Sequence, residues 1–470
     1  MKRIGELPDD ILLGIFDFYV DVGPWSETKI RIQAWQSLVH VCQRWRTLVL
    51  ESPRRLNLQL LCTPETPIKD IMDVWPAALP LIVKGSMSVS RTNNVITALG
   101  QNNRVCRVSL WNLAGWQSEE VVAAMQVPFP ELTYLRLVSD RGPGTQPVTP
   151  VPNSFLGGSA PRLQTILLSG IPFPGVPNLL LCANHLVDLS LSNIPHAGYI
   201  SPEAMAALIS VLSSLRMLWL HFLSPQSHPD WESQSLPPLK RSNLPALKEF
   251  HFHGVSEYLE ELVNRIDTPQ INVMDICFFN QIDFECPRLA QFIHRTPRLR
   301  ERDTAHIQFN DGCITVGLRF WTPVLDKFLI TITFTELDWQ HSSIEQICNS
   351  SLHPISTVED LYLEHLCLML VWENGAVETA LWSQFLLPFT AVKKLYISKE
   401  FAPDIAAALQ DLVEGRITDV LPSLQNIYVE GLETSGPFEE NIGRFVAARR
   451  LSDHPIAISV WDKNPYMEWT

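Results

Sequence analysis

One short apolar pattern recurs along most of this 470-residue chain and constrains its fold more than any other feature. The pattern is apolar-x-x-apolar-x-apolar, and its copies are VCRVSL at 105, LTYLRL at 132, LQTILL at 163, LVDLSL at 186, LRMLWL at 215, LKEFHF at 247, INVMDI at 271, VEDLYL at 358, VKKLYI at 392 and LQNIYV at 424. Neighbouring copies begin between 23 residues (163 to 186) and 34 residues (358 to 392) apart, with one wider gap after 271. Self-similarity at such periods is typical of stacked repeats, in which each unit buries its apolar face against its neighbours.

The last three positions of each copy predict a short strand whose first and third side chains point into a core. The intervening segments return the chain, so successive strands are expected to be parallel. Apolar residues at helical spacing predict return helices at 203–215, 257–266, 343–348 and 403–413. The predicted fold class is therefore α/β: an irregular leucine-rich-repeat-like solenoid with a parallel sheet over 104–465, preceded by connecting or first solenoid turns over 56–103.

The pattern lapses between 300 and 357. Asn310-Asp311-Gly312 predicts a hairpin turn before ITVGLRF, and FLITITF at 328 predicts a replacement strand. Two segments rich in proline, 141–161 and 224–239, are expected to be loops.

The first 55 residues have a different, helical pattern. In the opening LPDDILLGIF and the residues after it, apolar side chains at 7, 11, 12, 15, 16 and 19 follow the repeat of one helical face. Pro8 is tolerated in a first helical turn, and IRIQAWQSLVHVCQRWRTLVLES (30–52) predicts one long helix or two abutting helices that end at Pro53. A unit this short buries little of its own apolar surface, so a second surface is expected to cover it.

LPDDILLGIF followed by SLVHVCQRWRTLVLESP resembles an F-box, a trihelical unit that binds the Skp-type adaptor of cullin-based ubiquitin ligases. The resemblance covers about the first 55 residues and implies a substrate-recruiting region behind them. It implies adaptor contacts at Leu7, Pro8, Ile11, Leu12, Ile15, Phe16, Val41, Cys42 and Trp45. The connector between the two motifs is longer than the family usually has, and Pro53-Arg54-Arg55-Leu56 replaces its common Leu-Trp ending. The alternative is a coincidental helical hairpin whose apolar residues form the core between this head and the solenoid.

The middle residue of each predicted strand points away from the core, and several of these residues are aromatic. The predicted client-binding residues are Trp219, His251, Tyr362, Tyr396 and Tyr428. Aromatic side chains with a polar tip are favoured at interface hot spots. They also suit strands and pack on one another, so a purely structural role is the alternative.

The motifs of the sequence favour a protein that is not an enzyme. His251 and His253 form a His-x-His that a metal-dependent hydrolase could use, but no further ligand set completes a metal site. The chain has no nucleophile elbow, phosphate-binding loop or dinucleotide fingerprint, so no catalytic residue and no cofactor are expected.

Composition and charge narrow the classes of partner. The formal net charge is −14 and the basic residues form no run, which argues against nucleic acid. No segment predicts a signal peptide or a membrane helix, and nine scattered cysteines without a Cys-x-x-Cys pair favour reduced thiols, so a cytoplasmic or nuclear location is expected.

Taken together, these features predict a non-catalytic substrate-recruiting adaptor of a Skp–cullin–F-box type ligase. Its expected partners are the Skp-type adaptor, the cullin scaffold and a protein client, without nucleic acid or membrane. Two alternatives stay open: a repeat scaffold acting outside a ligase, and a hydrolase with a metal at His251 and His253.

Overall fold

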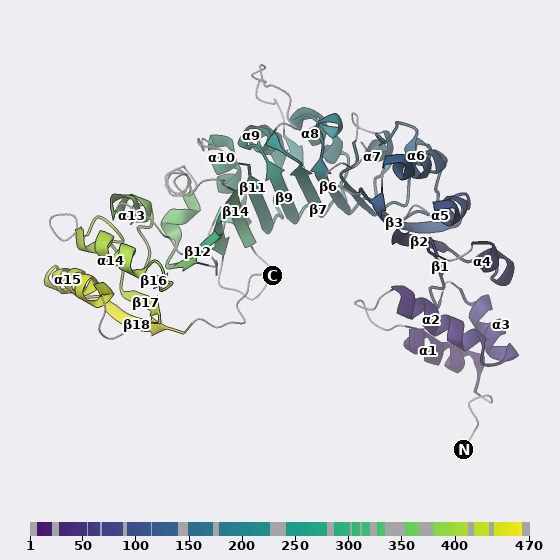
Figure 1. The fold of residues 1–470 in the computed structure, drawn as a ribbon, viewed down its shortest axis with the longest axis horizontal. Coiled ribbons are helices and arrows are strands. Elements are labelled where there is room, and N and C mark those ends of the chain that lie inside the picture. The colour runs from purple at the N-terminus through teal and green to yellow at the C-terminus, as the bar shows by residue number, and fades with distance from the viewer. Residues whose placement is uncertain are drawn as a thin grey trace. The chain divides into compact units, whose positions relative to one another are not determined.

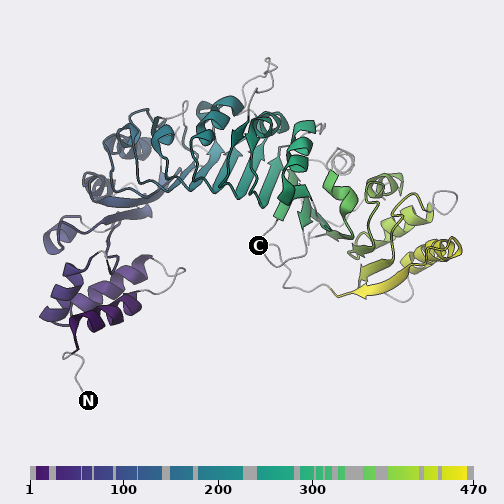
Figure 2. The same ribbon diagram turned by 180° about the vertical axis from the view of Figure 1, so that it is seen from behind.

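The computed structural model divides the chain into two compact units, Met1–Ile200 and Ser201–Thr470, which are described separately (Figure 1, Figure 2). The structure describes residues 7–20, 28–53, 55–65, 68–87, 92–113, 115–139, 149–172, 178–225, 241–279, 286–300, 303–310, 313–319, 327–333, 353–365, 379–411, 418–431 and 437–462.

The first unit begins with three helices, here called the head: α1 (Asp9–Val20), α2 (Thr28–Val39) and α3 (Gln43–Glu51). Segment 30–52 therefore contains two helices, which are separated at residues 40–42. Helix α1 starts after Pro8, whose carbonyl accepts the Leu12 N–H at 3.0 Å, and Asp9 and Asp10 place negative charge at its positive end.

The head is joined to the first repeat through Trp35. Its ring is buried and lies edge-to-face with Trp75, with 4.9 Å between the ring centroids. Its indole Nε1 donates to the Gln59 carbonyl at 3.2 Å. A buried aromatic ring with a satisfied N–H is a specific anchor, so the head packs on the repeats of its own unit.

The sheet of the first unit is fully parallel, and its strands pair in chain order. The strands are β1 (Leu60–Cys62), β2 (Leu81–Ser86), β3 (Val105–Leu113), β4 (Tyr134–Ser139), β5 (Thr165–Ser169) and β6 (Asp188–Ile194). Between them lie α4 (Ile68–Val74), α5 (Thr92–Leu99), α6 (Gly115–Ala124), η2 (Phe155–Gly158) and α7 (Asn178–Cys182), and η3 (His196–Gly198) follows β6. Helices α5, α6 and α7 lie along one face of this sheet (Figure 1).

The second unit also contains strands connected by helices. Its elements are α8 (Pro202–Ser210), β7 (Met217–Phe222), β8 (Ser242–Asn243), β9 (Glu249–Gly254), α9 (Ser256–Arg265), β10 (Ile266–Asp267), β11 (Val273–Phe278), α10 (Pro287–Arg295), α11 (Pro297–Arg300), β12 (Thr304–Asn310), β13 (Cys313–Arg319), β14 (Lys327–Thr333), η5 (His353–Thr357), β15 (Asp360–His365), α13 (Thr379–Leu386), β16 (Lys394–Ile397), α14 (Ala402–Asp411), β17 (Asn426–Glu430), α15 (Pro437–Leu451) and β18 (Ala457–Trp461). Helices α8, α9 and α10 again share one face of their strands (Figure 1).

Strands β12, β13 and β14 form an antiparallel meander inserted in reversed order between β11 and β15. Strand β14 pairs with β11 and β12 pairs with β15, both in parallel. The predicted parallel sheet is therefore interrupted in this region, where β13 runs against both of its neighbours, as the predicted hairpin requires. The predicted strand at 328 is confirmed as β14, and Asn310 pairs with Cys313 as a two-residue hairpin requires, although residues 311 and 312 lie outside the described part of the chain.

The cores of both units come from the first and third positions of the predicted strands. Leu135 and Leu137 of β4 are 0% exposed, as are Leu361 and Leu363 of β15. All ten copies of the pattern end in an observed strand, so the prediction of an α/β fold with a large parallel sheet is confirmed apart from the meander.

The predicted return helices have three counterparts: α8, α9 and α14. The helix expected at 343–348 lies outside the described residues, as do all but residues 224 and 225 of the second proline-rich segment. Of the first proline-rich segment, 149–161 is described, and η2 is its one helical turn in that range. A search of the described residues finds no helix both long and apolar enough to cross a membrane.

Candidate functional site

Helix α1 has two apolar faces, and only one of them is used inside the chain. Leu12, Phe16 and Val20 are spaced four residues apart and are buried in the head. The second face consists of Ile11, Ile15, Phe18 and Tyr19, which are 49%, 42%, 89% and 52% exposed. An exposed apolar face of this size on a short helix is typical of a surface that a partner covers.

The residues expected to contact an adaptor fall into three groups. Pro8, Ile11, Ile15, Val41 and Cys42 are exposed. Leu7 and Trp45 are half-buried. Leu12 and Phe16 are 0% exposed, so a protein bound to the second face of α1 would not touch them.

Buried Phe16 supports the exposed face from behind. Its ring lies edge-to-face with Trp45 of α3, with 4.7 Å between the centroids. Arg44 of α3 also holds the start of α1, because its guanidinium donates to the Leu7 carbonyl at 2.6 Å and pairs with the Asp9 carboxylate. These contacts fix α1 on α3, so the Ile11–Tyr19 face is presented by a braced helix.

The second candidate site lies on the outward positions of the strands of the second unit. Strand register aligns His306 with Tyr362, Tyr362 with Tyr396, and Tyr396 with Tyr428. Adjacent strands are about 4.8 Å apart, which is also a favourable separation for stacked rings. Three tyrosines predicted to lie on successive strands are therefore side by side.

These four side chains form one continuous stack, called here the aromatic column (His306, Tyr362, Tyr396 and Tyr428). Successive centroids are 4.1, 4.1 and 4.6 Å apart, and the rings are within 10° of parallel. Trp461 of β18 meets Tyr362 and Tyr396 edge-on at 5.9 and 5.7 Å. Burial first, and then the neighbouring Tyr396, raise the pKa of the Tyr362 hydroxyl, which favours its neutral form.

Trp219 and His251 make a smaller stack in the same unit. Their rings are 4.4 Å apart and 16° from parallel, and Trp219 is 38% exposed. The Nδ1 atom of His251 is 3.4 Å from Oδ2 of Asp275 on the next strand. This carboxylate orients the imidazole, so a partner would meet an indole beside a histidine held in a fixed plane.

The His251–His253 pair is engaged in packing. His253 stacks at a tilt on His221, with centroids 4.1 Å apart, and touches Phe279 at 4.7 Å. Burial, and secondarily His221, lower the pKa of His253 to about 4. Within the described residues, no group of three or more histidine, cysteine or acidic side chains is arranged to hold a metal.

Sequence reasoning missed Phe18, His306 and Trp461. Phe18 lies seven residues after Ile11 and three after Ile15, so the helical repeat is the signal that could have identified it. His306 follows the buried Ala305 and precedes the buried Ile307 in TAHIQFN, and this alternation is the signal that could have identified its strand. Trp461 ends a last strand, AISVW, that the six-residue pattern does not cover.

Comparison with known proteins leaves the family of this chain open. No family model matches it, and no curated protein matches it. Among solved structures, the leucine-rich repeat-containing protein LegL7 from Legionella pneumophila is 12% identical and aligns over 83% of this chain and 97% of its own, with a TM-score of 0.27. A TM-score this low does not establish a common fold.

Proposed function

We propose that this protein is a non-catalytic adaptor that recruits a protein client to a Skp–cullin–F-box type ubiquitin ligase. The head would bind the Skp-type adaptor, and the second sheet would hold the client. The mechanism is proximity, since holding two reactants together raises their effective concentration without new chemistry. The expected location is cytoplasmic or nuclear, where that machinery works.

The observation that carries the proposal is the second apolar face of α1. Ile11, Ile15, Phe18 and Tyr19 are exposed although the head has its own buried core. Covering a large apolar side chain stabilises an interface by roughly 1.5–3 kcal/mol. The position of this face within the segment that resembles an F-box supports a Skp-type adaptor as its occupant.

The adaptor test uses the full-length chain with Ile11→Asp and Phe18→Ala together. Both side chains are exposed, so the fold should persist while affinity for a purified Skp-type adaptor falls at least ~30-fold, the loss expected at an interface hot spot. Isothermal titration calorimetry measures it. Val74→Asp, which changes an exposed apolar residue of α4, is the matched control and should bind normally. Adaptor affinity that is unchanged in the double variant would refute the proposal.

Trp219, His251 and the three tyrosines supply the proposed client surface. Trp219→Ala and Tyr428→Ala remove the two ends of their stacks, Trp219 exposed and Tyr428 half-buried. The double variant should keep the adaptor and lose ubiquitin transfer to any client that the parent chain modifies in a reconstituted ligase. A client still modified at the parent rate would show that these side chains are structural.

A repeat scaffold acting outside a ligase is the competing function. Such a scaffold would use the same client surface, but a partner other than a Skp-type subunit would bind the exposed face of α1. Co-purification separates the two functions, because only the ligase adaptor retains stoichiometric Skp-type subunit and cullin. The metal-hydrolase alternative has the weakest support, since His251 pairs with Asp275 and His253 packs on His221 and Phe279.

A further inference from the structure

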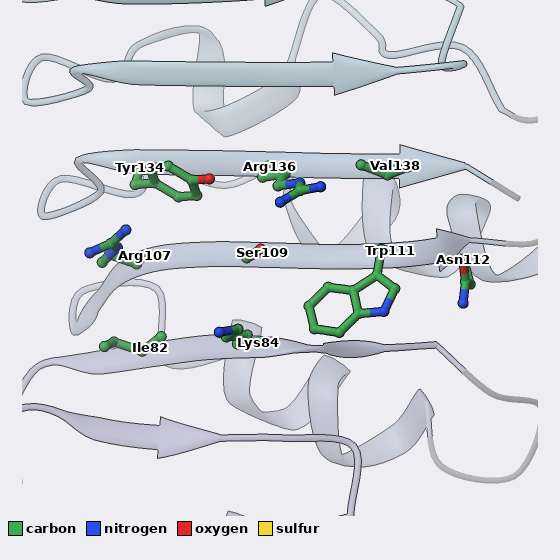
Figure 3. Close-up of a pocket in the computed structure, with 9 residues that line it drawn as sticks. All are labelled: Ile82, Lys84, Arg107, Ser109, Trp111, Asn112, Tyr134, Arg136 and Val138. Atoms are coloured by element: carbon green, nitrogen blue, oxygen red, sulfur yellow. The ribbon is translucent and has the colours of Figure 1, made fainter. Parts of the chain in front are cut away.

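The outward face of the first sheet carries a hollow of about 530 Å³ over β2, β3 and β4 (Figure 3). Among the residues that line it are three cations and two aromatic rings, called here the basic depression: Lys84, Arg107, Arg136, Trp111 and Tyr134. None of its nine lining residues is acidic. In a chain with a net charge of −14, this concentration of positive charge is unusual.

Strand register explains the hollow. Lys84 of β2 pairs with Ser109 of β3, and Ser109 pairs with Arg136 of β4, so a small residue lies between two long cations. The two cationic Cα atoms are two strand spacings apart, about 10 Å. Figure 3 shows Trp111 on the same face of β3, further along the strand.

The cations of the depression lack carboxylate partners within the described part of the chain. Arg107 lies over the ring of Tyr134, with its Cζ atom 4.6 Å from the centroid, and this contact holds the guanidinium without neutralising it. Two carboxylates of the same unit are engaged elsewhere: Glu131 pairs with Arg162, and Asp188 accepts from the Thr165 hydroxyl at 3.1 Å. Among the described residues, the depression therefore presents three positive charges without a carboxylate partner.

We propose that the basic depression binds an extended, acidic segment of a partner polypeptide through its side-chain carboxylates. A single carboxylate would leave two of the three cations unpaired. In an extended segment, carboxylates two residues apart lie about 7 Å from one another on one side, which matches cations spread over three strands. The rest of this acidic chain repels such a segment, so electrostatics restricts binding to this place.

This proposal concerns the first unit's sheet and does not depend on the adaptor function of the head. The probe is a fluorescein-labelled octapeptide that alternates Glu and Ser, and its reference replaces every Glu with Gln. Fluorescence anisotropy with the full-length chain should show at least tenfold tighter binding of the Glu peptide. Binding should weaken as NaCl rises from 50 to 300 mM, because exposed charges are screened by salt.

The test variant combines Lys84→Gln with Arg136→Gln. It should lower the affinity for the Glu peptide at least tenfold. Lys69→Gln with Arg162→Gln is the matched control, because it removes the same charge from exposed sites of the same unit outside the depression. The control should change affinity less than twofold. Circular dichroism should be unchanged in both, because all four side chains lie at least partly in solvent.

Three results would overturn the proposal. Equal weakening by the control pair would mean non-specific attraction to positive charge. Equal binding of the Glu and Gln peptides would mean that carboxylates are not recognised. Tighter binding of a Gln peptide bearing one phosphoserine than of the Glu peptide would assign the depression to phosphoryl groups instead.

Discussion

The outward faces of the strands in the two units are built from opposite chemistry, although their inward faces are alike. In the first unit, outward positions carry Lys84, Ser109 and Arg136, whose side chains surround a hollow. In the second unit, the equivalent positions carry Tyr362, Tyr396 and Tyr428, whose rings fill the space between strands by stacking. Inward leucines determine the fold in both, so the outward residues are free to define two different binding surfaces.

The largest predicted effect is a loss of stability on truncating the inward leucines, which the two units have in common. Leu135→Ala in β4 and Leu395→Ala in β16 each empty a position that is 0% exposed, and each should cost about 2–5 kcal/mol. Hydrogen–deuterium exchange should rise locally, in β3–β5 for the first variant and in β15–β17 for the second.

The control for these two variants is Val460→Ala in β18, which truncates a side chain that is 55% exposed and should leave exchange unchanged. A loss below about 1 kcal/mol for either leucine would mean that its sheet does not depend on the inward ladder.

An intermediate effect distinguishes the two outward faces. Tyr396→Ala removes two ring stacks and the edge contact with Trp461, so its unit should lose about 1–3 kcal/mol. Arg136→Ala in the first unit removes an exposed side chain that makes no ion pair with the described residues, and the unfolding free energy should change by no more than about 0.5 kcal/mol.

Denaturant unfolding, monitored by hydrogen–deuterium exchange in β4 and β16, measures the difference in stability loss between the two variants. Tyr396→Phe is the conservative control, because it keeps the ring and removes only the hydroxyl. Equal losses of unfolding free energy for Tyr396→Ala and Arg136→Ala would contradict the distinction between a stacked and an open outward face.

The smallest predicted effect is on the pH dependence of the melting temperature. Burial lowers the pKa of His253 from the ordinary 6.5 to about 4, so between these values the unfolded chain binds a proton that the folded chain does not. Acidification through this window therefore favours unfolding, and His253→Gln should reduce the fall in melting temperature between pH 6.5 and 4.

Thermal scans across that pH range test the histidine prediction. His185→Gln, at an exposed site of the first unit, is the matched control and should leave the slope unchanged. A steeper slope in His253→Gln would contradict the assigned direction.

The sequence predicted strand positions better than strand order. Alternation in LTYLRL or VKKLYI places two side chains in the core, which is a local property, and each copy of the pattern ends in a strand. Strands β1 and β2 lack the six-residue pattern and were not separated from the connector. The reversed meander depends on which edge β11 offers to a later strand, and no local pattern encodes that choice.

The candidate sites likewise include parts that a local sequence pattern predicts and parts that it does not. Tyr362, Tyr396 and Tyr428 occupy the same position of three copies, so their alignment could be predicted. The basic depression could not be predicted, because Lys84 belongs to a strand without the pattern and the register shifts between Leu110 and Leu113 in β3. On α1, periodicity could not divide the apolar residues between the buried and the exposed face.

The reversed meander has a consequence for synthesis of the chain. In a simple repeat protein, each new strand finds its neighbour already made, so a nascent chain can fold as it emerges. Here β11 pairs on one side with β9, which is already made, and on the other with β14, which is made after β12 and β13. Until residue 333 has left the ribosome, β11 has an open edge, and such edges recruit other chains. A pause in translation over 303–333 is therefore the moment at which this protein is most exposed to misassembly and most in need of a chaperone.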